Sequence, residues 1–272
     1  MKTAIYQYWD GTPRPSCYAG VRNMREYADH IGADYKFEQN PNWLRTRWKI
    51  ENGGYSAHYG AFKPLFDSAW DDYDKILFVD TDVFAVDGLE ENVFEHFHGE
   101  IGICDEPFQP KQRTITKGRI TSEQDNRWAN MVKKHYGVEV PRTDEGLVRI
   151  FNTGMVLYSK QGRLKAQKDF DKFDNYIRLV KTSGLDSFYT CDQPYLHAMM
   201  YAKDFDVQEM DNNWNSYVHG TRDINHANRY IVDHRTDETK FVHCQFPGAD
   251  NMNEAQLLRV VNLPREEWNY EI

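Results

Sequence analysis

The chain has 272 residues, of which 40% are hydrophobic and 14% aromatic, and a formal net charge of −9 at pH 7. A chain of this length buries a substantial α/β core without disulfides or structural metals, so a single domain is expected. The acidic balance argues against a nucleic-acid partner, because phosphate binding needs a concentrated excess of Lys and Arg. An anionic substrate would therefore need a local source of positive charge.

The spacing of the cysteines and the hydropathy of the sequence indicate the cellular compartment of the protein. Cys17, Cys104, Cys191 and Cys244 lie far apart and form no C-x-x-C pair. This spacing favours reduced, mostly buried thiols over a zinc site or a disulfide framework. No apolar run reaches the length of a membrane span, and the first residues lack the apolar stretch of a signal peptide. These features predict a soluble, cytoplasmic protein without a transmembrane segment.

The first forty residues predict a β-α-β unit. Residues 3–8 alternate in polarity and are rich in β-forming side chains, residues 16–31 have helical spacing, and residues 34–37 return to strand character. Residues 40–55 are rich in Asn, Gly and aromatic side chains. They are predicted to form a loop that could cover a site.

The next segment contains the clearest strand signal of the sequence. A helix is predicted over residues 64–70, where a proline suits the first helical position. Residues 75–79 (KILFV) form an uninterrupted apolar run, which is typical of a central strand covered on both faces. Residues 101–104 and 151–158 are predicted to be further strands of the same sheet, so an α/β fold is expected.

Insertion-like material separates those last two strands. Residues 108–146 hold a basic, polar stretch and one helix, whose start carries a capping box formed by Thr121 and Gln124. Residues 163–182 predict one long helix, which Gly184 ends.

Two carboxylates, Asp80 and Asp82, follow the KILFV strand directly. At the C-terminal end of a buried strand they project into the crevice where open α/β sheets bind ligands. Burying such a pair without compensation would be costly, which makes a divalent cation the natural partner.

The pattern FVDTDVF fits two classes of enzyme. In haloacid-dehalogenase-like phosphatases, a strand ending in D-x-D supplies an aspartyl nucleophile and an acid/base, and it is normally the first strand of the core. Here a β-α-β unit precedes the motif, and no paired acidic motif follows a late strand. A phosphatase that uses Asp80 and Asp82 is kept as the alternative.

The second class is the GT-A glycosyltransferases, and the resemblance covers four motifs. KILFVDTDVF resembles the strand and D-x-D signature of retaining glycosyltransferase family 8, which includes glycogenin and the bacterial lipooligosaccharide galactosyltransferases. FNTGMVLYSK, CDQPYLH and FVHCQFPG resemble the family's F-N-[ST]-G, D-Q-x-x-L-N and H-[FY]-x-G elements. The motifs occur in the family's order, and the resemblance covers roughly residues 3–248.

This resemblance implies a GT-A fold, which is a Rossmann-like α/β fold with a mostly parallel central sheet and helices on both faces. It implies a single domain, residues 1–272, with a nucleotide-binding half to about residue 104 and an acceptor-binding half from about residue 105.

The implied reaction is metal-dependent transfer of a hexose or deoxyhexose from a nucleotide-diphosphate sugar to a glycan or other hydroxyl acceptor. A UDP-sugar donor and retention of configuration are favoured. The implied cofactor is Mn²⁺ or Mg²⁺, which would screen the diphosphate and stabilise the charge on the leaving nucleotide. Asp80, Asp82 and His243 would be its ligands. A catalytically inactive carbohydrate-binding relative is a further alternative.

Further residues receive roles by their place in these motifs and by their chemistry. The loop after the first strand cradles the nucleoside in GT-A enzymes, where an aromatic face can stack on uracil. The expected nucleotide-binding residues are Tyr6, Tyr8, Trp9, Asp10, Lys63, Asp80 and Gly248.

The expected donor-sugar residues are Asp105, Asn152, Gly154, Asp192 and Gln193. Asp192 and Gln193 are the candidate catalytic pair, since they match residues on the far face of the sugar in retaining enzymes. Asp192 could instead only cap the helix that it begins. Trp214 and Tyr217 are the candidates for stacking on the acceptor.

The sequence departs from the family after Gly248. Gly248-Ala249-Asp250-Asn251 stands where a G-x-x-K-P-W tail is usual. A lysine contact to the diphosphate is therefore not expected here, and another cation must replace it if one is required.

Overall fold

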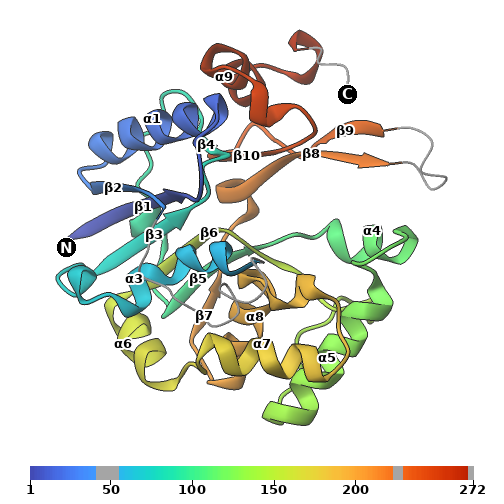
Figure 1. Ribbon diagram of the computed structural model, residues 1–272. Coiled ribbons are helices and arrows are strands. Elements are labelled where there is room, and N and C mark those ends of the chain that lie inside the picture. The colour runs from blue at the N-terminus through green and yellow to red at the C-terminus, as the bar shows by residue number, and fades with distance from the viewer. Residues whose placement is uncertain (41–54, 223–228, 269–272) are drawn as a thin grey trace.

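The computed structural model describes residues 1–40, 55–222 and 229–268 (Figure 1). The predicted loop over residues 40–55 lies outside this part of the chain except for its two end residues.

A six-stranded sheet with the order β2-β1-β3-β6-β5-β7 forms the centre of the molecule. β6 is antiparallel to both of its neighbours, and the other three pairs of adjacent strands are parallel. The expected α/β class with a mostly parallel sheet is therefore confirmed. The strands are β1 (Thr3–Trp9), β2 (Asp34–Gln39), β3 (Lys75–Val79), β5 (Ile101–Asp105), β6 (Phe151–Ser159) and β7 (Val207–Glu209).

A second sheet, with the order β4-β10-β8-β9, lies beside the first. β10 is antiparallel to β4 and parallel to β8, which places His243 between Val83 and Tyr217. This sheet was not predicted from the sequence. Its strands are β4 (Val83–Ala85), β8 (Ser216–Arg222), β9 (Arg229–Asp233) and β10 (Phe241–Gln245).

Helices cover both faces of the central sheet, as expected. Figure 1 shows α1 on one face and α3, α6, α7 and α8 on the other. None of the described helices is both long and apolar enough to cross a bilayer. The helices are α1 (Pro15–His30), α3 (Lys63–Phe66), α4 (Gln109–Ile115), α5 (Ser122–Tyr136), α6 (Lys160–Asp169), α7 (Phe173–Thr182), α8 (Asp192–Ala202) and α9 (Glu254–Asn262).

The side chains of β3 alternate between two hydrophobic cores. Ile76 and Phe78 pack in the core that α5, α7 and α8 share. Leu77 and Val79 pack in the core that contains Met24 of α1. Because successive strand residues point to opposite faces, a strand buried on both faces needs an unbroken apolar run. This explains the KILFV segment. The four cysteines are free and buried, as expected.

The predicted helix over residues 163–182 is two helices, α6 and α7. The chain is extended at Phe170, whose ring packs on those of Tyr195 and Phe205. The Tyr195 hydroxyl donates a hydrogen bond of 2.6 Å to the Asp171 carbonyl. These tertiary contacts stabilise the break, although the local sequence favours one continuous helix.

Two smaller expectations are also corrected. The helix predicted over residues 64–70 is interrupted at Asp67, which is extended and caps the short 3₁₀ turn Ser68–Trp70. At the start of α5, Thr121 accepts from the backbone N–H of Gln124, but the Gln124 Oε1 atom has no hydrogen-bond partner in the described part of the chain. Only half of the capping box therefore forms.

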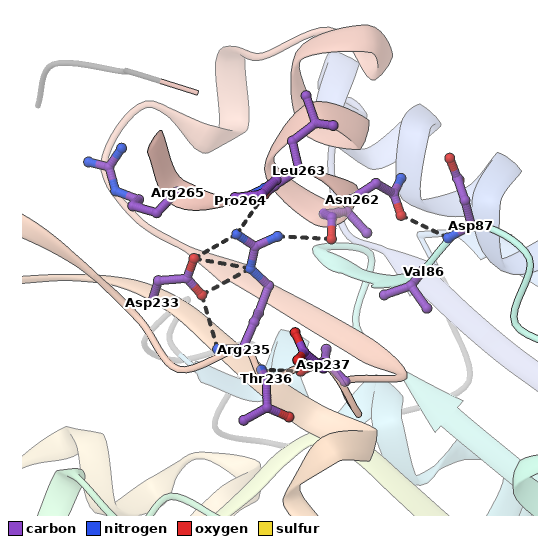
Figure 2. Close-up of a pocket in the computed structure, with 12 residues that line it drawn as sticks. Val86, Asp87, Asp233, Arg235, Thr236, Asp237, Asn262, Leu263, Pro264 and Arg265 are labelled. Atoms are coloured by element: carbon purple, nitrogen blue, oxygen red, sulfur yellow. Dashed lines mark hydrogen bonds and ion pairs between the residues drawn. The ribbon is translucent and has the colours of Figure 1, made fainter. Parts of the chain in front are cut away.

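A cavity of about 500 Å³ lies between the end of β9 and the last turn of α9 (Figure 2). The Arg235 guanidinium pairs with Asp233 and donates to the carbonyl oxygens of Val260, Val261 and Leu263. The last carbonyls of a helix lack partners within the helix. Arg235 therefore caps α9, and its hydrogen bonds give this wall of the cavity a structural role.

Helix α1 packs directly on the turn that carries the two aspartates. A Cβ atom at Gly20 would lie 2.0 Å from the Thr81 carbonyl oxygen, so only glycine permits this approach. The position of Asp80 and Asp82 therefore depends on a glycine sixty residues earlier in the chain.

Replacing Gly20 by Ala should displace α1 or the turn, because the clash is with backbone rather than with a flexible side chain. The expected loss in the free energy of unfolding is about 1–3 kcal/mol, the range for overpacking. Urea denaturation measures it. Tyr18→Ala, at an exposed position of the same helix, is the control and should change stability by less than about 0.5 kcal/mol. Equal stability of Gly20→Ala and the wild type would contradict the close packing.

Candidate metal and nucleotide site

Three residues from two distant parts of the chain converge beyond the end of β3. Asp80, Asp82 and His243 each offer a possible metal-ligand atom, and these atoms lie within 4.8 Å of one another. The two aspartates lie on the turn between β3 and β4, and His243 lies on β10 beside β4. The fold thus brings together the three ligands that the sequence motifs implied.

Buried backbone and amide contacts hold the turn in place. The Asp80 N–H donates to the Gly154 carbonyl at 2.7 Å, and the fully buried Gln7 donates through Nε2 to the Asp80 carbonyl at 3.0 Å. The Cys244 N–H donates to the Asp82 carbonyl at 2.9 Å. Strands β1, β6 and β10 therefore each fix one point of the turn.

The His243 imidazole is fully buried, and its two nitrogens have different surroundings. Nδ1 lies 3.2 Å from the Asn215 Oδ1 atom. Since an amide oxygen only accepts, neutral His243 carries its proton on Nδ1 and exposes the Nε2 lone pair. Nε2 is also buried, and it lies 3.3 Å from an Asp82 oxygen, which is ion-pair distance when the ring is protonated.

Burial and neighbouring charges shift the pKa values of Asp80 and His243. The pKa of Asp80 is raised well above its usual value by burial and by repulsion from Asp82 and Asp192, although His243 acts in the opposite sense. For His243, burial alone would lower the pKa. Attraction to Asp82, Asp80 and Glu106 outweighs burial, so the pKa of His243 is raised.

Gly154 leaves the space that these groups need. A Cβ atom there would lie 2.5 Å from the His243 Cε1 atom and 3.0 Å from an Asp80 carboxylate oxygen. Any larger residue would therefore intrude on the cluster. Two carboxylates and an imidazole lone pair around this space form a suitable donor set for a divalent metal ion.

A cavity of about 370 Å³ adjoins the two aspartates. It brings Tyr8, Trp9 and Asp10, the predicted nucleoside residues, together with Asp80 and Asp82. The full set of lining residues is Tyr8, Trp9, Asp10, Ser16, His58, Asp80, Thr81, Asp82 and Asp250. Ser16, His58 and Asp250 were not singled out in the sequence, because they come from three separate segments that only the fold brings together.

Three of the predicted nucleotide residues do not line this cavity. Tyr6 is fully buried in the core and packs edge-on against Trp70. The Lys63 ammonium pairs with Glu38, at 2.5 Å for one of its oxygens, and lies 3.7 Å from Asp67. In this structure, Lys63 is therefore directed at carboxylates of its own half rather than at a ligand. Gly248 has a left-handed conformation (φ +91°) and begins the 3₁₀ turn that carries Asp250.

Asp192, one of the predicted donor-sugar residues, lies beside the strand that carries Asn152 and Gly154. The Asp192 carboxylate accepts from the Thr153 hydroxyl at 2.7 Å, which places it beside Gly154. The N-cap of α8 is Cys191, and Asp192 is the first helical residue. Asp192 is therefore not the N-cap residue and contacts the strand that carries the Asn-Thr-Gly motif.

Glu106 is the buried carboxylate that joins this group, and the sequence did not reveal it. Asn152 donates to one of its oxygens at 3.3 Å and Gln193 to the other at 3.2 Å. Burial raises the pKa of Glu106, and Arg113 only partly offsets the increase. The predicted residue was its neighbour Asp105, which instead pairs with Arg149. Asp105 is the last residue of β5 and Glu106 follows it directly, and their sequence does not show which one contacts Asn152.

Neither predicted acceptor-stacking residue presents a face to solvent. Trp214 is 2% exposed and packs edge-on against Phe241 in the core, so the prediction that it stacks on an acceptor is not supported by the structure. Tyr217 is 3% exposed, and its ring stacks on His243 with centroids 5.1 Å apart. The adjoining Phe108 ring contacts Tyr217 and is only partly buried.

No known protein-family model matches the sequence, and no curated protein matches it. Among solved structures, the chain is similar to a glycosyltransferase involved in the glycosylation of the major capsid of PBCV-1. The two are 10% identical with a TM-score of 0.48, over 96% of this chain and 98% of that chain.

A second similar structure is the galactosyltransferase LgtC in complex with donor and acceptor sugar analogues. It is 15% identical with a TM-score of 0.45, over 97% of this chain and 98% of that chain. Both structures are glycosyltransferases, the class that the sequence motifs resemble. Both TM-scores lie below 0.5, so neither similarity establishes the function of this chain.

Replacing His243 by Ala should weaken Mn²⁺ binding and reduce its pH dependence. A metal ion competes with protons for its ligands, so wild-type affinity should fall as the pH drops. Because the pKa of His243 is raised, this fall should begin above about pH 6.5, the ordinary value for imidazole. The variant should lose about one proton from the slope of log affinity against pH. The part of the slope that arises from protonation of Asp80 should remain.

Calorimetry with Mn²⁺ alone, over a series of pH values, measures both effects. His135→Ala, at an exposed position on α5, is the control and should behave as the wild type. Wild-type affinity and slope in His243→Ala would show that His243 is not a ligand.

Proposed function

We propose that this protein is a metal-dependent glycosyltransferase of the GT-A type that uses a UDP-sugar. The observation that carries the proposal is the convergence of Asp80, Asp82 and His243 at a cavity lined by Tyr8 and Trp9. A metal site at the carboxyl end of a central strand, next to aromatic side chains, suits a ligand with a base at one end and a diphosphate at the other.

The cavity supports the nucleotide part of the proposal. Its volume of about 370 Å³ lies within the usual range for small-molecule sites. Tyr8 and Trp9 would stack on the base, and Asp10 would accept from the base or the ribose. The half of the chain up to about residue 104 would thus bind the nucleotide, and the rest would bind the acceptor.

The donor set favours Mn²⁺ over Mg²⁺. Carboxylates suit both ions, but an imidazole ligand is more typical of transition metals. Asp80, Asp82 and His243 would hold the ion, which when bound would stabilise negative charge on the departing diphosphate. Asn215 would support it by holding His243 in the required tautomer.

The donor sugar would lie between Gly154 and the start of α8. Asn152 and Gly154 would face it, with Asp192 and Gln193 as the catalytic pair. Asp192 would stabilise positive charge that develops at the anomeric carbon, and Glu106 would orient Asn152 and Gln193 through its two hydrogen bonds. This arrangement supports retention of configuration.

Replacing Asp82 by Ala should abolish the Mn²⁺-dependent part of UDP binding, since it removes one of three ligands. UDP affinity in Mn²⁺ should fall to the value measured without metal, while thermal unfolding remains cooperative. Calorimetry measures it. Asp87→Ala, an exposed carboxylate five residues later, is the matched control. Unchanged metal-linked affinity in Asp82→Ala would overturn the proposed function.

An assay with a panel of nucleotide sugars separates the alternatives. Mn²⁺-dependent release of UDP from one of them supports a transferase. Release of phosphate from a simple phosphomonoester, without UDP-sugar turnover, would identify the phosphatase alternative. UDP-sugar binding without any turnover would identify an inactive carbohydrate-binding relative.

The glycoside product should keep the anomeric configuration of the donor, because the Asn-Thr-Gly and Asp-Gln motifs resemble those of retaining enzymes and the Asp192 carboxylate is held beside Gly154 by Thr153. The anomeric coupling constant in a proton NMR spectrum of the fresh product measures this. A product of inverted configuration would place the enzyme outside the retaining class and remove the proposed role of this pair.

A further inference from the structure

The cavity beside the metal cluster has an unbalanced charge for the ligand proposed above. Four of its described lining residues are carboxylates, namely Asp10, Asp80, Asp82 and Asp250, and none is Lys or Arg. A nucleotide diphosphate brings further negative charge. One divalent ion offsets only about two of these charges, so tight binding requires a second cation nearby.

Arg14 lies at the rim of this cavity. It immediately precedes α1, whose second residue, Ser16, lines the cavity. The Arg14 guanidinium pairs with the carboxylate of Asp250, which also lines the cavity. Arg14 thus contacts a residue that borders the space that a diphosphate would occupy.

The Arg14–Asp250 ion pair can exchange partners at little cost. Both side chains are about half exposed, at 52% and 56%. An ion pair in such a position contributes little to stability, because water screens it and two long side chains must be ordered. A guanidinium prefers to bind phosphate oxygens through two N–H groups at once, and a diphosphate offers more charge than one carboxylate.

The start of α1 adds to this positive rim. Arg14 is the N-cap residue, yet no side chain caps the helix and no acidic residue lies in its first turn. The positive end of the helix dipole is therefore not offset by any side chain of the first turn. The Ser16 hydroxyl donates to the Asp250 carbonyl at 3.0 Å and ties this end of α1 to the turn that follows Gly248.

We propose that Arg14 exchanges Asp250 for the diphosphate of the nucleotide donor and supplies the second cation of the site. This inference rests on the proposed function, and it assigns a diphosphate contact to a segment remote in sequence from the turn after Gly248. Asp250 occupies the guanidinium in the unliganded protein and competes with the nucleotide for it.

Binding of UDP and of uridine to Arg14→Ala, both measured by calorimetry in Mn²⁺, tests the proposal. UDP affinity should fall about ten- to hundredfold, which is the usual effect of losing hydrogen bonds to a charged group. Uridine affinity should stay within about twofold of the wild type, since uridine lacks the diphosphate. Arg14→Lys should recover part of the UDP affinity because it restores the charge without the two-pronged geometry.

Two further variants separate this role from a structural one. Arg22→Ala breaks a comparable ion pair made by a residue within α1, that between Arg22 and Glu254 at 2.5 Å, and neither residue lines the cavity. It should bind UDP as the wild type does. Asp250→Asn breaks the Arg14 pair but leaves the arginine and removes a repelling carboxylate, so it should bind UDP more tightly.

The outcomes distinguish the two proposals. If the wild type binds UDP and Arg14→Ala binds it equally well, the role of Arg14 is overturned but the proposed function is not. Equal losses of UDP and uridine affinity in Arg14→Ala, or a similar loss of UDP affinity in Asp250→Asn, would show a structural role and overturn it too. A wild type that binds no UDP in Mn²⁺ would overturn the proposed function and this inference with it.

Discussion

The arrangement of this protein depends on the burial of the His243 imidazole beside two aspartates. Its Nε2 atom is inaccessible to solvent and lies 3.3 Å from an Asp82 oxygen, while Asp80 next to it is half-buried. Such a group of polar atoms costs folding free energy unless something compensates for it. A bound cation would do so and would stabilise the folded state by mass action. In our proposal, the site is therefore a region where stability is given up for binding.

Much of the surrounding fold fixes this costly cluster. Gly20 lets α1 touch the aspartate turn, and Gly154 leaves the room that His243 and Asp80 need. The turn also marks the place where the chain leaves the central sheet after β3 and enters the second sheet as β4. A ligand at this junction contacts both sheets, so its binding should couple the two halves of the molecule.

In our proposal, the distribution of charge explains how an acidic protein could hold an anion. The walls of the cavity are acidic. The cations that would balance a diphosphate are a metal ion and, in our proposal, Arg14, which pairs with Asp250 when no nucleotide is bound. Keeping Arg14 paired in the unliganded protein avoids an isolated charge at the rim. It also makes diphosphate binding an exchange of partners, in which selectivity arises from the stronger contact of guanidinium with phosphate.

The sequence by itself determined the features that follow from local pattern. The apolar run KILFV required a strand covered on both faces, and the aspartates after it were predicted as metal ligands from their place at its end. The β-α-β opening and strands β5 and β6 were likewise predicted from the pattern of apolar residues. The motif order also pointed to His243, whose imidazole does lie beside the two aspartates.

Only the tertiary structure decided the partners and the burial of the polar side chains. It joined Glu106 to Asn152 and Asp105 to Arg149, enclosed Trp214 and Tyr6 in the core, and paired Lys63 with Glu38. It also brought Asn215 to His243 and Arg14 to the rim of the cavity through contacts between residues far apart in sequence. The physical reason is that local pattern fixes the period of a strand or helix, whereas the direction and partner of a polar side chain depend on packing between segments that the pattern does not relate.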